Sequence, residues 1–136
     1  MRLFLVGTAF VWSLIAVWLG GLSEAQEGFT KRDTQGPVTV IVTLISSPSP
    51  GAPIKAKVVL DTHSAALDGV AFERAVAVRT ADGAEVPPTA VEQASGSGHH
   101  REAVLIFPPS PQSDGVRILV RNVGGVAERT FLWEAQ

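Results

Sequence analysis

The sequence predicts an all-β protein, an immunoglobulin-like β-sandwich of about seven strands preceded by an apolar N-terminal segment. Three observations predict it. From residue 37 onward, short runs rich in Val, Ile and Thr place apolar side chains at every second position, as in half-buried strands. Clusters of Gly, Pro, Ser and Asn separate these runs. No window shows the period of 3.6 that a helix requires.

The predicted strands share this alternation and end at turn residues. In chain order they span residues 38–44, 54–60, 72–79, 89–93, 103–107, 116–121 and 128–133. Because proline cannot donate to a ladder, Pro87 and Pro88 limit the fourth strand to a short edge strand. Residues 94–98 (ASGSG) are expected to form a flexible loop tip, and residues 64–67 are the single weak helical candidate. The run 103–107 is apolar on both faces, which predicts a strand inside a sheet.

The N-terminal segment, residues 1–25, has the pattern of a secretory signal. Arg2 precedes an uncharged, mostly apolar stretch over residues 3–22, and Ala25 offers a cleavage site that would leave Gln26 as the first residue. The alternative is an uncleaved anchor, because such a stretch can span a hydrocarbon layer of about 30 Å. Either way the remainder is expected to be exported, to the periplasm or the outside, or anchored to the cytoplasmic membrane. Residues 26–36 are expected to be a flexible lead-in, and residues 37–136 the sandwich.

Composition excludes several classes of function. The net charge is −2 and the 11 Lys and Arg residues are scattered, so nucleic acid is not an expected partner. Cysteine is absent, which excludes disulfides, a thiolate nucleophile, Cys-ligated zinc and a blue-copper centre.

A candidate site follows from the predicted strand order. In an immunoglobulin-like sandwich the second and fifth strands pair antiparallel, so Asp61 and His63 should lie beside His99 and His100. Directly opposed residues in such a pair have Cβ atoms only ~4.5–5.5 Å apart. Imidazole and carboxylate together suit Cu(II) or Zn(II), so these four residues are candidate metal ligands.

In the alternative interpretation, these four side chains have a structural role and bind no metal. Asp61 then caps its own turn and pairs with Arg101, while the histidines are polar residues at the rim. Catalysis fits poorly, because Ser64 follows His63 directly and adjacent side chains of a strand point to opposite sides. The protein is therefore not expected to be an enzyme. The expected core aromatics are Phe72, Phe107, Phe131 and Trp133, and the charges expected on a solvated sheet face are Glu73, Arg74, Arg117 and Arg121.

Three segments carry a resemblance to known proteins. The segments LDTHS (60–64), GHHR (98–101) and RTFLW (129–133) resemble an uncharacterised family of short exported prokaryotic β-domain proteins. The resemblance implies the β-domain fold and places the two His-bearing segments together. The Asp61-Thr62-His63 segment is also similar to the copper-ligating segment of periplasmic copper-resistance proteins of the CopC type. In that family the segment lies late in the chain and an N-terminal histidine completes the site, whereas here it lies mid-chain.

The sequence thus predicts a non-catalytic exported β-sandwich that acts as a binding or scaffold module, with a protein partner at the cell envelope. The alternative is a periplasmic protein that binds Cu(II) or Zn(II) through His63 with His99 or His100, helped by Asp61.

Overall fold

The computed structural model describes residues 29–45, 49–109 and 115–135, and in these residues the chain forms two antiparallel sheets. One sheet has the strand order β1-β2-β3-β7-β6 and the other β5-β4-β8-β9. Their elements are β1 (Thr30–Asp33), β2 (Val38–Leu44), β3 (Ile54–Thr62), α2 (Phe72–Ala75), β4 (Val76–Arg79), β5 (Glu85–Val86), β6 (Ala90–Ser97), β7 (His100–Phe107), β8 (Val116–Val123) and β9 (Val126–Trp133).

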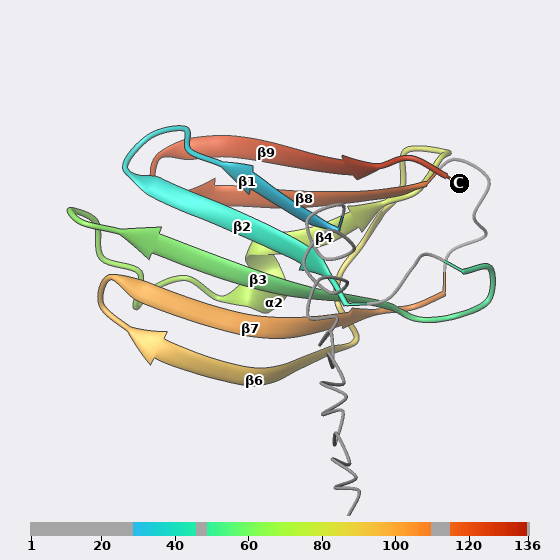
Figure 1. Ribbon diagram of the computed structural model, residues 1–136, viewed down its shortest axis with the longest axis horizontal. Helices are drawn as coiled ribbons and strands as arrows, with labels where there is room; N and C mark the ends of the chain where they lie inside the picture. Colours follow the sequence, from blue (N-terminus) through green and yellow to red (C-terminus); the bar gives the residue numbers. More distant parts are fainter. Residues whose placement is uncertain (1–28, 46–48, 110–114, 136) are drawn as a thin grey trace, which may run out of the picture.

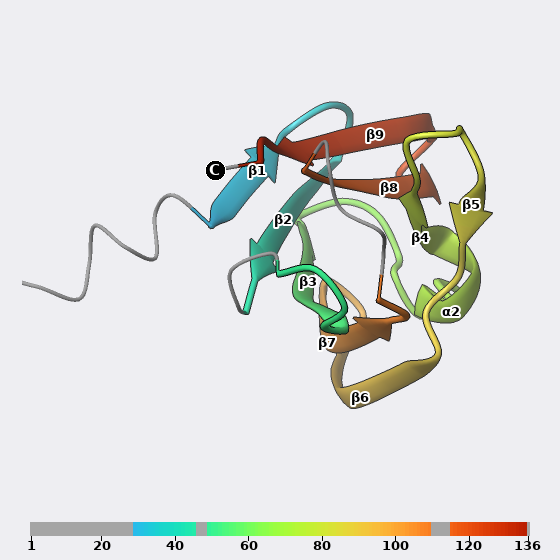
Figure 2. The same ribbon diagram turned by 90° about the vertical axis from the view of Figure 1, so that its right-hand side faces the viewer.

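The two sheets lie face to face and enclose a single apolar core (Figures 1 and 2). Alternate residues of the long strands point inward, because side chains of a strand alternate between its two faces. Fully buried examples are Val40 of β2, Val58 of β3, Leu105 of β7 and Ile118 of β8, each 0% exposed. The predicted burial of Val58 and Leu60 is therefore confirmed, and the protein is a β-sandwich.

The pairing of β3 with β7 is the feature that positions the candidate site. These strands are antiparallel, with Ile54 opposite Phe107 at one end and Asp61 opposite His100 at the other. The predicted partnership of the second and fifth strands is confirmed, and β7 lies inside its sheet as its apolar sequence indicated.

Two strands were not predicted. β1 pairs with β2 through Thr30 opposite Thr43, so residues 30–33 are a strand instead of part of a flexible lead-in. β5 adds two residues to the other sheet beside β4. Both strands are too short to show a period of two in the sequence. They are recognised in the structure because they pair with the neighbouring strands β2 and β4.

The predicted strand over 72–79 is wrong in its first half, where α2 forms one helical turn. The amides of Arg74 and Ala75 donate to the carbonyl of Ala71, and Phe72 is buried. In Figure 2, α2 lies at the side of the sandwich where the chain crosses from one sheet to the other. The weak helical candidate at 64–67 forms no helix: residues 64 and 65 are bends, and residues 66 and 67 are irregular.

The predicted flexible tip at 94–98 is also wrong, because most of it belongs to β6. β6 is the edge strand that was expected, but it is longer and continues through a bulge between Glu92 and Ser95. Gln93 adopts φ 50° at this bulge. The connection to β7 shrinks to Gly98 and His99, a two-residue turn with Gly98 at φ 63°.

The predicted signal or anchor, residues 1–25, lies outside the described residues. Within the described residues, no helix is long and apolar enough to cross a membrane.

Candidate functional site

The two His-bearing segments meet where β3 ends and β7 begins. The amide of Thr62 donates to the carbonyl of His99 over 3.0 Å, and Asp61 faces His100 across the ladder. His63 lies just beyond the end of β3, and His99 occupies the β6–β7 turn; both are exposed. The backbone therefore brings the four predicted residues to one corner of the sheet.

The side chains at this corner make separate pairwise contacts instead of one convergent group. Nδ1 of His100 is 3.9 Å from Oδ1 of Asp61, and its Nε2 is 3.7 Å from Oε2 of Glu102. Glu102 also accepts from Nζ of Lys57 at 3.0 Å, and this hydrogen bond is the main reason that the pKa of Glu102 is below its ordinary value. In the part of the chain that the structure describes, no group of three or more His, Asp or Glu side chains is arranged to hold a metal ion.

Thr62 holds the turn that follows β3, a role that the sequence argument gave to Asp61. Its hydroxyl accepts hydrogen bonds from the amides of Ser64 (3.2 Å) and Ala65 (3.1 Å) and donates to the carbonyl of Pro37 (2.7 Å). Thr62 is 4% exposed, whereas Asp61 points outward. The inward position allows Thr62 to reach both the turn and the start of β2.

Arg101 holds the middle of the same loop, although it was expected to pair with Asp61. Its guanidinium donates to the carbonyl of Leu67 (3.0 Å) and to that of Val70, and it lies 5.1 Å from the ring centroid of Phe72. Arg101 sits opposite Leu60, on the inward side of the sheet, so its side chain cannot share a face with the outward Asp61.

The β6–β7 turn also holds the loop that follows β3. The amide of Leu67 donates to the carbonyl of Gly98, and the amide of Gly98 donates to Oδ1 of Asp68, each over 2.9 Å. Residues 62–71, which we call the anchored loop, are therefore joined to β2, β7 and the β6–β7 turn. A loop with so many fixed backbone contacts has little conformational entropy left to lose on binding.

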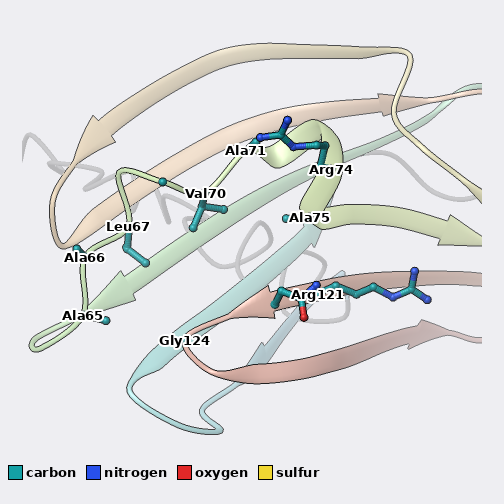
Figure 3. A pocket seen from close by; sticks show the side chains of 11 residues that line it. Ala65, Ala66, Leu67, Val70, Ala71, Arg74, Ala75, Arg121 and Gly124 are labelled. Carbon is teal, nitrogen blue, oxygen red and sulfur yellow. The ribbon is translucent and has the colours of Figure 1, made fainter.

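The anchored loop forms one wall of a pocket of about 320 Å³ (Figure 3). The other walls are α2 and the end of β8 with its turn into β9. The pocket is lined by small and apolar side chains, glycine backbone, an amide and two arginines: Ala65, Ala66, Leu67, Gly69, Val70, Ala71, Arg74, Ala75, Arg121, Asn122 and Gly124. Sequence reasoning missed this pocket; the available signal was the concentration of Ala and Gly between residues 65 and 75, side chains too small to fill the space between elements.

The two arginines of the pocket differ in their surroundings. Arg121 belongs to a network on the outer face of its sheet, where it pairs with Glu85 and Glu128. Arg79 pairs with the same two carboxylates, at 2.9 and 3.3 Å, so two positive and two negative charges alternate. Hydrogen bonds from Arg121 and Arg79 lower the pKa of Glu85 to about 2. Arg74 lies outside this network, on the exposed side of α2.

No protein-family model, curated protein or solved structure matches the chain. The class of protein that the fold and site define is a β-sandwich domain with a loop-lined pocket.

Proposed function

We propose that this protein is an exported, non-catalytic immunoglobulin-like β-sandwich that acts as a binding module, with the anchored loop and its pocket as the binding surface. The strand order supports the immunoglobulin-like assignment. Without the short β1 and β5, the strands in chain order become A to G, and the sheets read A-B-E-D and C-F-G, the arrangement of constant-type immunoglobulin domains.

The observation that carries the proposal is the coincidence of a pre-ordered loop with a concave surface. Thr62, Arg101 and Asp68 fix the loop from three sides, and the pocket lies against it. Binding sites are commonly loops held on a rigid scaffold, and the volume of this pocket lies within the range of ligand pockets, which begins at about 300 Å³.

A fragment screen tests the proposal. The ¹⁵N-labelled protein, purified in the form that the cell exports, is mixed with a library of small molecules, and amide shifts are followed by NMR. Hits should shift amides of the anchored loop and of α2. Ala66→Trp, at an exposed position of the lining, should weaken those hits by about tenfold or more.

Ala81→Trp is the matched control, because it adds the same side chain at an exposed turn away from the pocket. It should leave the affinities unchanged. Hits that never involve the anchored loop, or that bind the two variants equally well, would refute the proposed surface.

The metal-binding alternative rests on His100, which lies between the carboxylates of Asp61 and Glu102. A metal bound by His100 would recruit one or both of them, with His63 and His99 at the same corner of the sheet. Cu(II) or Zn(II) at a hundredfold excess over its dissociation constant should then stabilise the protein by about 2.7 kcal/mol. His100→Ala should abolish the rise in melting temperature and Asp82→Asn, on the β4–β5 turn, should preserve it. An unchanged melting temperature at millimolar metal excludes this alternative.

Export is tested separately. Mass spectrometry of the exported protein should find Gln26 at the N-terminus if residues 1–25 are a signal. Recovery of an intact Met1 in the membrane fraction would instead establish the anchor over residues 3–22.

A further inference from the structure

We propose that the pocket beside the anchored loop binds a small monocarboxylate with a short apolar chain, and that Arg74 binds its carboxylate. This inference rests on the proposed function and names the ligand class of the same site.

The charge of the pocket points to an anion. Among the described residues, Arg74 forms no ion pair, whereas the charge of Arg121 is balanced by Glu85 and Glu128. Figure 3 shows the side chain of Arg74 running from α2 toward Ala71, while that of Arg121 extends along β8 away from Gly124. The guanidinium of Arg121 is held by its carboxylate partners, so Arg74 supplies the guanidinium that is available to a ligand.

The chemistry of a guanidinium narrows the anion to a class. Its planar donors match the two oxygens of a carboxylate, and this pairing is stronger and more directional than the one that lysine makes. Arg74 alone can balance one negative charge on a ligand. The amide of Asn122, also in the lining, adds a neutral donor and acceptor. A ligand with one carboxylate can therefore pair with Arg74 and hydrogen-bond to Asn122, whereas a second carboxylate on the ligand would lack a positive partner.

Part of the lining can contact an apolar chain, although polar atoms make up the larger share of the pocket surface. Ala65, Val70 and Ala75 are partly buried against the core and keep some apolar surface beside the exposed guanidinium. Leu67, at 1% exposed, closes the floor and offers little surface of its own. A volume of about 320 Å³ lies at the lower end of the range for ligand pockets, so the apolar chain must be short.

The charged groups of the lining do not favour a cationic ligand. Among the residues that the structure describes, the lining contains two arginines and no carboxylate. Asp68, which is not part of the lining, accepts from the amide of Gly98, and the carbonyls of Leu67 and Val70 accept from Arg101. Arg101 also adds positive charge behind the loop.

The test compares two ligands of equal length and opposite charge. Hexanoate and hexylamine are titrated into the exported form of the ¹⁵N-labelled protein at neutral pH. Hexanoate should produce saturable shifts at amides of the anchored loop and α2, and hexylamine should not. Arg74→Gln should raise the dissociation constant of hexanoate about tenfold or more, equivalent to about 1.4 kcal/mol, and Arg74→Lys by less.

Arg32→Gln is the matched control, since Arg32 is exposed on β1 and is not part of the lining. It should leave hexanoate binding unchanged. Equal shifts with hexylamine, no saturable hexanoate shifts, or binding that is indifferent to Arg74→Gln would each overturn the inference. If uncharged or cationic fragments still bind the pocket in that event, the proposed binding surface stands and only the ligand class is wrong.

Discussion

Nε of Arg129 in β9 donates to Oδ1 of Asp33 in β1 over 3.0 Å, and this ion pair joins the two sheets. The Arg129 side chain is completely buried, and its remaining donors reach the carbonyls of Gln35, Val38 and Val123. Burial acts to raise the pKa of Asp33, but hydrogen bonds from Gln35 and Arg129 outweigh it and lower that pKa below its ordinary value.

Replacing Asp33 should therefore be costly. Asp33→Asn leaves the charge of Arg129 buried with neutral partners alone, and we expect a loss of about 3 kcal/mol in the free energy of unfolding. Asp61→Asn is the control, because Asp61 is exposed, and it should change stability by less than about 0.5 kcal/mol. Urea denaturation measures both. Equal effects of the two variants would contradict the structural role of the pair.

Acid should weaken the same contact. Because the pKa of Asp33 is lower in the folded state, its contribution is complete above its unfolded pKa of about 3.9 and is lost as pH falls through the folded value. The wild-type protein should lose more stability below pH about 4 than Asp33→Asn does. Unfolding curves at a series of pH values provide the comparison, and parallel losses would contradict the assignment.

The charge network of the other sheet makes a second acid-sensitive element. The folded pKa of Glu85 is about 2, lowered mainly by its hydrogen bond from Arg121. Its contribution is present above the ordinary Glu pKa and disappears as pH falls toward about 2. Melting temperature should decline less steeply in this window for Glu85→Gln than for the wild type, and added salt should reduce the difference. A difference unaffected by pH would show that Glu85 acts through packing alone.

The turn after β3 should depend on Thr62 and not on Asp61. Thr62→Val keeps the shape of the side chain but removes the hydroxyl that hydrogen-bonds to the carbonyl of Pro37 and to the amides of Ser64 and Ala65. We expect a loss of about 1–3 kcal/mol and faster hydrogen exchange of the two turn amides. Asp61→Ala should cost less than about 0.5 kcal/mol. The reverse order would restore Asp61 as the residue that holds the turn.

Two glycines with nearly the same φ allow the cost of backbone strain to be compared with the cost of a steric clash. Gly83 has φ 87°, and a Cβ added there would lie more than 4 Å from every described residue beyond its two chain neighbours. Gly83→Ala should therefore cost about 1–2 kcal/mol, from the left-handed backbone alone. Gly96 has φ 86°, but its built Cβ lies 2.2 Å from the carbonyl oxygen of His100. Gly96→Ala must move β6 from β7, and its cost should exceed about 3 kcal/mol. Thermal unfolding of the two variants should show this gap; similar losses would mean that β6 shifts easily.

The sequence by itself determined the long strands and the meeting of the two His-bearing segments. Val58 and Leu60, like Val116, Ile118 and Val120, show the period of two that any half-buried strand needs, and that information is local. The same alternation also contained a signal that was not used: Arg129 shares its face with the buried Phe131 and Trp133, so it had to be buried too.

Tertiary structure decided which polar groups are satisfied, and by what. Asp33 and Arg129 are 96 residues apart, and Arg101 reaches carbonyls more than 30 residues away. No local pattern specifies such partners, because a buried polar group takes whichever complementary atom the packed strands bring to it. The short β1, the reassignment of the turn from Asp61 to Thr62, and the pocket beside the anchored loop all depend on contacts of this kind. They exist only once segments that are distant in the sequence have come together.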